Sequence, residues 1–209
     1  HMSKTTIPKG GITADAIDGT LIADDAISEE HLDATAITGT TALAETPSST
    51  DELLISDGGT LKRIDFSHIF NTPSFGVKLS SNQALTDGTL TKITWDSELW
   101  DTDSAFASNK FTVPSGKAGK YYFTTMGYTD GQDDGEHFFL AFYKNGSRIF
   151  REVGWTAPST NTGMRAMASV TLNLSAGDYI EVYGYQNEGS NRDISSDYAQ
   201  FSGHKLVGV

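Results

Sequence analysis

Oxygen-bearing side chains alternate along one acidic segment in a way that could hold a calcium ion. Asp130, Gln132 and Asp134 stand at every second position and Gly135 follows them, which is the ligand spacing and the sharp-turn glycine of many calcium loops. The twelfth position of such a loop needs a bidentate Glu, and Ala141 stands there instead. The pattern therefore leaves two interpretations, a calcium site or a solvated acidic loop between two strands.

Two tryptophans lie beside polar side chains of the kind that a sugar-binding surface needs. An aromatic ring covers the apolar face of a pyranose, while carboxylates and amides meet its hydroxyl groups. Either tryptophan could instead pack in a core or an interface, and the polar loop at 186–193 could serve only as a spacer. The candidate receptor-binding residues are Trp100, Asp101, Asp103, Trp155, Asn161, Asn187, Asn191 and Arg192.

Motifs of catalysis are absent from the sequence. It contains no Gly-x-Ser-x-Gly elbow, no His-Glu-x-x-His and no phosphate-cradling Gly-Lys-Ser/Thr. Cysteine is also missing, which removes thiolate nucleophiles and disulfides. Asp133 and Asp134 could in principle cleave a glycan, but adjacent carboxylates in one loop are a weak sign of acid–base chemistry. We expect a binding protein that is not an enzyme and requires no cofactor, with calcium as a possible ion.

The residues from Phe75 onwards must position these candidates, and they have the pattern of an all-β domain. Short strands and turns follow one another, with strict alternation of faces at 169–174 and a Gly-Asp turn before 179–183. The segment 138–143 is apolar on both faces. Such a strand belongs in the middle of a sandwich or at a subunit interface.

Several motifs of this domain resemble the jelly-roll superfamily of the complement C1q globular head and tumour necrosis factor. They are Asn-Lys-Phe-Thr-Val-Pro at 109–114, Gly-Lys-Tyr-Tyr-Phe at 119–123, Lys-Asn-Gly at 144–146, Leu-Asn-Leu-Ser-Ala-Gly-Asp at 172–178 and Phe-Ser-Gly-His-Lys-Leu at 201–206. The resemblance covers about 135 residues. It implies two antiparallel sheets in jelly-roll order and a threefold homotrimer that binds ligands through surface loops. It does not imply an enzyme.

Near the N-terminus an isoleucine or leucine recurs at every fifth position. A spacing of five fits neither the 3.6-residue period of a helix nor the two-residue period of a strand. Three chains wound about a common axis could each turn one apolar residue inward per pentad; a single-chain solenoid and disorder are the alternatives. After Ile7, the residues expected on the axis of this shaft are Ile12, Ile17, Ile22, Ile27, Leu32 and Ile37.

Between the pentads and the β domain, two apolar runs flank Asp57-Gly58-Gly59, which predicts a β-hairpin over 52–64. This hairpin would form a collar, and 66–73 would form a hinge. The predicted organisation is a cloning remnant at 1–2, a pentad-repeat shaft at 3–44, a β-hairpin collar and hinge at 45–72, and a jelly-roll tip at 73–209.

Charge narrows the classes of partner. The net charge is −12, so we expect no nucleic acid partner. No run of 18 apolar residues and no secretion signal occurs, so we expect no membrane insertion.

The pentads and the hairpin are similar to segments of bacteriophage and prophage tail fibres.

Taken together, these patterns predict a homotrimeric tail-fibre tip of the virion. It would bind a bacterial surface receptor, either a polysaccharide or a protein, and join other tail or baseplate proteins through its N-terminus. Two alternatives stay open: a structural trimerisation module whose fibre binds receptors elsewhere, and a cellular or spore-surface adhesin.

Overall fold

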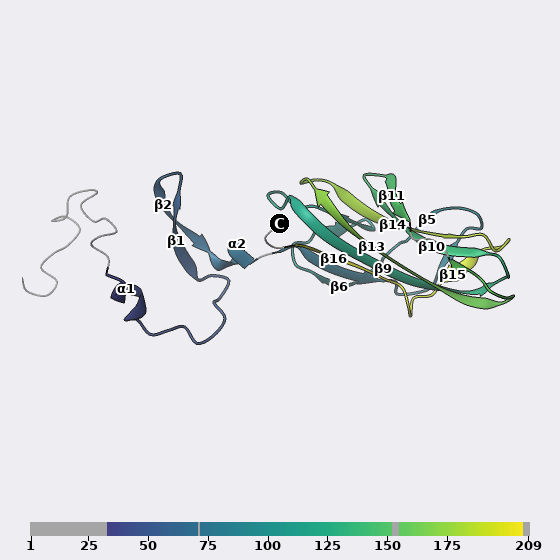
Figure 1. Ribbon diagram of the computed structural model, residues 1–209, viewed down its shortest axis with the longest axis horizontal. Helices are drawn as coiled ribbons and strands as arrows, with labels where there is room; N and C mark the ends of the chain where they lie inside the picture. Colours follow the sequence, from purple (N-terminus) through teal and green to yellow (C-terminus); the bar gives the residue numbers. More distant parts are fainter. Residues whose placement is uncertain (1–32, 71, 152–154, 207–209) are drawn as a thin grey trace, which may run out of the picture. The chain divides into compact units, whose positions relative to one another are not determined.

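The computed structural model describes residues 33–70, 72–151 and 155–206 (Figure 1). The chain falls into two compact units, His1–Phe66 and Ser67–Val209. Of the predicted shaft residues, Ile37 lies in the short helix α1 (Thr35–Thr38) and is exposed. The other predicted shaft residues, Ile12, Ile17, Ile22, Ile27 and Leu32, lie outside the described residues.

The predicted hairpin is present in the N-terminal unit. Strand β1 (Glu52–Asp57) pairs with β2 (Thr60–Asp65), and the register sets Leu53 opposite Ile64. The two turn glycines have φ of 59° and 83°, which are the positive values that a tight hairpin turn needs. Where a hinge was expected, the chain forms the short helix α2 (Phe66–Phe70).

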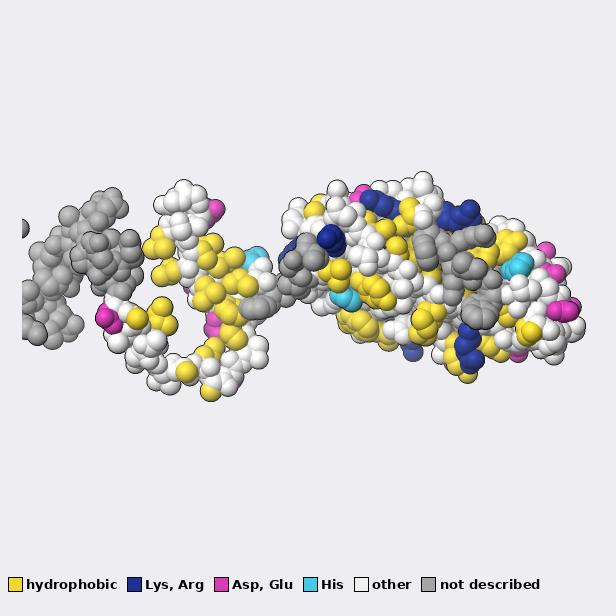
Figure 2. All heavy atoms as spheres, viewed as in Figure 1, with side chains coloured by type: hydrophobic (Ala, Val, Ile, Leu, Met, Phe, Trp, Pro, Cys, Tyr) yellow, Lys and Arg dark blue, Asp and Glu magenta, His cyan; other side chains and the backbone are white. Residues whose placement is uncertain are grey.

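The hairpin leaves its apolar side chains exposed. Leu54 is 75% exposed and Leu61 is 71% exposed, and Figure 2 shows apolar side chains over this unit. Among the described residues 33–66, none is buried. An isolated two-stranded hairpin is marginally stable in water, so these side chains need cover that the described part of this unit does not supply.

The C-terminal unit contains two antiparallel sheets of seven strands each. The first sheet consists of β3 (Ser74–Lys78), β4 (Gln83–Leu85), β6 (Ser97–Asp101), β9 (Gly119–Gln132), β13 (Thr162–Leu174), β15 (Arg192–Ile194) and β16 (Gln200–Lys205). The second sheet consists of β5 (Thr91–Lys92), β7 (Phe106–Ala107), β8 (Lys110–Thr112), β10 (His137–Lys144), β11 (Ser147–Arg151), β12 (Trp155–Thr156) and β14 (Tyr179–Gln186).

The order of the eight main strands makes this unit a jelly roll. One sheet runs β3-β16-β9-β13 and the other runs β8-β14-β10-β11. When these eight strands are numbered in chain order, the first sheet has the order first, eighth, third, sixth. The second sheet has the order second, seventh, fourth, fifth. That pairing is the double Greek key of a jelly roll. The fold predicted for this part of the chain is confirmed.

Aromatic rings fill the space between the sheets. Phe75 stacks on Phe111 with ring centroids 4.8 Å apart, and meets Phe201 edge-on at 4.8 Å. The apolar strand β10 lies between β11 and β14, in the middle of its sheet, and Phe138 points into this core. Its neighbour Phe139 is buried on the opposite face. No helix among the described residues is long and apolar enough to cross a membrane.

Candidate functional site

A polar pocket of about 520 Å³ lies at one end of the jelly roll. Its walls come from the end of β9, the turn before β13, strand β15 and the loops around it. The lining residues are Asn82, Tyr128, Asp130, Gly131, Asn161, Asn191, Arg192, Asp193 and Ser195. The chain enters this unit near Ser74, and Ser74 and Tyr122 both pair with His204, so the start of β9 lies at the entry end. Asp130 stands near the other end of β9. The pocket therefore lies at the end of the jelly roll opposite the entry of the chain.

A bidentate ion pair holds one wall of the pocket. Arg192 donates from Nε to Glu188 Oε2 at 2.7 Å, and its Nη2 contacts Glu188 Oε1. This pairing lowers the pKa of Glu188 and, with the charges of Asp133 and Asp130, raises the pKa of Arg192. A planar guanidinium held at two points has little rotational freedom. Arg192 is therefore a fixed element of the wall.

Gly131 makes room for this arginine. Its φ is +69°, and a Cβ there would lie 3.0 Å from Arg192 Nη1. The strand can accept the guanidinium at this point because residue 131 has no side chain.

Tyr128 forms a second wall and carries the aromatic ring of the pocket. Burial raises the pKa of its hydroxyl, and the charge of the hydrogen-bonded Asp130 carboxylate adds to the rise. The Tyr128 and Tyr198 rings meet edge-on with centroids 5.2 Å apart. The Arg165 guanidinium lies 5.4 Å from both centroids, a distance at which cation–π attraction acts.

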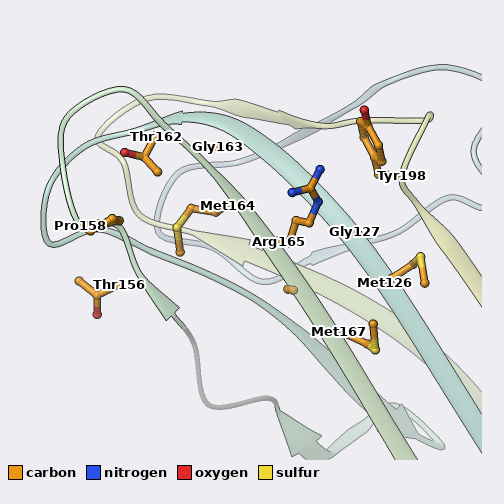
Figure 3. Close-up of a pocket in the computed structure, with 11 residues that line it drawn as sticks. Met126, Gly127, Thr156, Pro158, Thr162, Gly163, Met164, Arg165, Met167 and Tyr198 are labelled. Carbon is orange, nitrogen blue, oxygen red and sulfur yellow. The ribbon is translucent and has the colours of Figure 1, made fainter.

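Next to these rings, an apolar groove of about 900 Å³ runs along β9 and β13 (Figure 3). Met126 and Met167 contribute exposed thioether side chains to it. Arg165 and Tyr198 line the groove and also contact Tyr128. The polar pocket and the apolar groove are therefore neighbours that share this aromatic cluster.

The structure brings four of the predicted site residues together. Asp130, Asn161, Asn191 and Arg192 come from three separate segments and all line the polar pocket. The remaining predicted member of the polar loop, Asn187, does not line it. Its Oδ1 accepts a 2.7 Å hydrogen bond from the His137 backbone N–H, which fixes the start of β10.

The sequence placed the three candidate calcium ligands in a loop, and the structure differs in this placement, while calcium binding itself stays a prediction. Strand β9 continues to Gln132, so Asp130 and Gln132 belong to a strand, and the turn begins only after them. Gln132 is fully buried, whereas Asp134 is exposed. In the part of the chain that the structure describes, no three His, Cys, Asp or Glu side chains cluster as a metal site. Asp130 is exposed whereas Gln132 is buried, because Gly131 between them has a φ of 69° and breaks the alternation of the strand.

The predicted tryptophan sites lie elsewhere. Trp100 is on β6, and β16 and β3 separate it from β9 in the sheet. Asp101 accepts a 2.7 Å hydrogen bond from the Phe106 backbone N–H, and Asp103 accepts one from Thr102 at 2.8 Å. Both carboxylates therefore stabilise a turn. Trp155 begins β12, where its backbone pairs with Phe138; its side chain is outside the described part of the chain.

Sequence reasoning missed Asn82 and Tyr128. Asn82 Oδ1 accepts hydrogen bonds from the Ser196 backbone N–H and hydroxyl, across a separation of 114 residues, which no local pattern reveals. Tyr128 stands at an outward position of β9. The alternation of apolar and polar residues along 119–131 predicts that its side chain points outward, but it does not predict which residues lie beside it.

No family model and no curated protein matches the chain. Solved structures do resemble it. The globular domain of the zebrafish complement 1qA protein is 19% identical, with a TM-score of 0.46, over 64% of this chain and 97% of that one. Murine APRIL at pH 5.0 is 13% identical, with a TM-score of 0.49, over 65% of this chain and 100% of that one. What they bind does not transfer to this chain.

Proposed function

We propose that the chain is the homotrimeric tip of a bacteriophage tail fibre, which recognises a glycan receptor on a host cell and catalyses no reaction. The observation that carries this proposal is the position of the polar pocket. It opens at the end of the jelly roll opposite Ser74, where the chain enters from the N-terminal segment. A receptor-binding site belongs at the end of a domain that faces away from its own stalk.

Exposed apolar side chains support the homotrimer. Leu54 and Leu61 are exposed on the hairpin, and Met126 and Met167 are exposed on the groove of the jelly roll. Monomeric proteins rarely expose large contiguous apolar patches, and such patches mark interaction surfaces. Further copies of the same chain would cover both surfaces, because every copy carries both the hairpin and the groove.

The pentad repeat supports the tail-fibre context. Its apolar residues recur at a spacing that one isolated chain cannot present as a single stripe, and three parallel copies would give each of them a partner. Such a fibre presents three identical tips together. Weak binding at each pocket then becomes useful avidity on a surface that is dense in receptors.

Two measurements test this proposal. Sedimentation of the full chain at micromolar concentration is expected to give the mass of three copies, and a monomer would contradict the assembly. Fluorescently labelled chain is expected to adsorb to a subset of intact bacterial strains, and periodate oxidation of the cell-surface glycans is expected to remove that adsorption. Adsorption that resists periodate but not protease treatment would identify a protein receptor instead.

A structural trimerisation module is the second candidate function, favoured by the apolar groove on β9 and β13. Both functions require the trimer, so the mass alone does not separate them. Adsorption separates them, because a trimer that binds none of a broad strain panel would act only as a scaffold. A cellular or spore-surface adhesin would share the adsorption, and it is distinguished by detection of the chain on cells and not in purified phage particles.

A further inference from the structure

We infer that the polar pocket takes a neutral or amino-bearing sugar residue and discriminates against acidic sugars. This inference rests on the proposed function, since it names the class of glycan that the same site would recognise. Three features of the pocket support it: its size, its hydrogen-bonding groups and the sign of its charge.

The size of the pocket suits a short saccharide. Its volume of about 520 Å³ falls within the range of about 300–1,000 Å³ that small-molecule sites occupy. It is far larger than a single ion needs. The pocket is also rigid, because Glu188 fixes Arg192 and because Tyr198 and Arg165 pack against the Tyr128 ring.

The lining groups match the two chemical faces of a pyranose. Asn82, Asn161 and Asn191 present amides, and Asp130 and Asp193 present carboxylates, which accept hydrogen bonds from sugar hydroxyl groups. Tyr128 adds the apolar area of an aromatic ring. A purely acidic cluster would lack both the amide donors and this ring.

The charge of the pocket decides which sugars fit. Arg192 is the cation among the described lining residues, and its charge is already paired with Glu188, which accepts from Nε and Nη2. Asp130 and Asp193 form no ion pair with a described residue. The field at the pocket is therefore negative. A uronate or sialate would meet like charges, whereas the ammonium group of an amino sugar would meet a carboxylate.

Saturation-transfer NMR with the full chain tests this inference. The probes are the methyl glycosides of glucose, galactose, mannose, glucosamine and galactosamine, together with those of glucuronic and galacturonic acid. At least one neutral or amino sugar is expected to bind, and its uronic acid counterpart is expected to bind about tenfold more weakly or not at all. Equal or tighter binding of the uronate would overturn the inference, as would the absence of signal from every neutral and amino sugar.

The variant Asp130→Asn/Asp193→Asn removes both carboxylates while keeping the shape of the side chains. It is expected to abolish most of the tenfold discrimination against the uronate, and the single variant Asp193→Asn, on an exposed residue, is expected to abolish part of it. Asp134→Asn is the matched control, because Asp134 is exposed and lies outside the pocket lining. A change in selectivity as large in the control as in the double variant would assign the effect to overall charge.

Bacterial adsorption separates this inference from the proposed function. If the wild-type chain adsorbs to bacteria and Asp130→Asn/Asp193→Asn adsorbs with the same strain and sugar preference, the proposed function stands and the pocket assignment fails. If the pocket binds sugars with the expected preference but no strain adsorbs the trimer, the assignment stands and the role in host recognition fails.

Discussion

Asn145 and Asp178 join two turns of the jelly roll that are 33 residues apart in the chain. Asn145 Nδ2 donates to Asp178 Oδ1 at 2.8 Å, and Asn145 Oδ1 accepts a 2.9 Å hydrogen bond from the Tyr179 backbone N–H. Lys144 and the Ser175 backbone N–H also reach the Asp178 carboxylate, at 2.8 Å and 2.9 Å. The Lys-Asn-Gly and Gly-Asp motifs of the sequence therefore act as one clasp.

This clasp makes the stability of the jelly roll depend on pH. The hydrogen bond from Lys144, followed by those from Asn145 and Ser175, lowers the pKa of Asp178 from 3.8 to about 2. The ionised carboxylate thus favours the folded chain, fully above about pH 4, and its contribution is lost as the pH falls towards about 2. We expect Asp178→Asn to lower the melting temperature at pH 6 and to lower it less at pH 2.

Melting curves from pH 6 to pH 2 check this expectation, with Asp197→Asn as a control that changes the same charge at an exposed position. Glu188, whose pKa is also lowered, contributes acid sensitivity of the same sign, so the comparison is made between variants at each pH. A difference between Asp178→Asn and wild type that is constant over the whole range would contradict the linkage.

Gly76 and Trp100 are coupled by direct packing. A Cβ at position 76 would lie 2.4 Å from the Trp100 ring, so Gly76→Ala must displace the indole. Overpacking of this kind costs about 1–3 kcal/mol. We expect Gly76→Ala to destabilise the chain by that amount, and to cost much less in a Trp100→Ala background, where the ring is gone.

Urea unfolding of the two single variants and the double variant measures this coupling as a double-mutant cycle. The displaced indole becomes more exposed than its present 45%, so Gly76→Ala is expected to change the tryptophan fluorescence of the chain but not that of the Trp100→Ala background. If the two substitutions add without coupling, the indole does not occupy the space above Gly76.

Lys92 and Glu181 form an ion pair that is largely sheltered from water. Lys92 Nζ lies 2.6 Å from Glu181 Oε1, and the side chains are 30% and 9% exposed. Removing one partner leaves a buried charge without compensation, which costs about 3–5 kcal/mol when both groups are fully buried. Since Lys92 keeps some solvent contact, we expect Lys92→Met to cost about 2 kcal/mol, below the fully buried case.

The double variant Lys92→Met/Glu181→Gln is expected to recover much of that loss, because it removes the unpaired charge. Chemical unfolding at low and high salt measures both variants. A surface pair would be weakened by salt, so strong salt dependence of the Lys92→Met effect would contradict the sheltered geometry.

The sequence predicted the all-β class because its signals are local, and the jelly-roll order was expected from the resemblance of its motifs. Turns at Asn145-Gly146 and Gly177-Asp178, and inward alternation along the strands, repeat over the whole domain. The site was predicted in part for the same reason. Asn161, Asn191 and Arg192 stand in turn-rich polar segments, and such segments gather at the ends of a sandwich.

What the sequence could not supply was contact between distant segments. The pocket joins Asn82 to the segment around Asp193, a neighbourhood created by strand pairing over more than one hundred residues. The sequence also placed Asp130 and Gln132 in a loop, whereas β9 runs through both residues. Ligand spacing alone does not reveal whether a segment is a loop or a strand end.

The exposed hairpin gives the sharpest test of self-association. Leu54 is 75% exposed in a unit whose described residues bury no core, so replacing it should not unfold a single chain. In the trimer, Leu54→Asp would place three carboxylates in an apolar contact, where charges are strongly disfavoured. We expect the proposed trimer of Leu54→Asp to be weaker, so that it dissociates at a chain concentration at least about tenfold higher than wild type.

Sedimentation over a range of concentrations measures this dissociation, and Thr60→Asp is the matched control because it adds the same charge to an exposed hairpin residue. Melting of the jelly roll should be unchanged at concentrations where both variants are monomeric, since Leu54 belongs to the other unit. Identical sedimentation of Leu54→Asp and Thr60→Asp would mean that the hairpin takes no part in holding the copies together, which would leave the pentad repeat and the groove along β9 and β13 to do so.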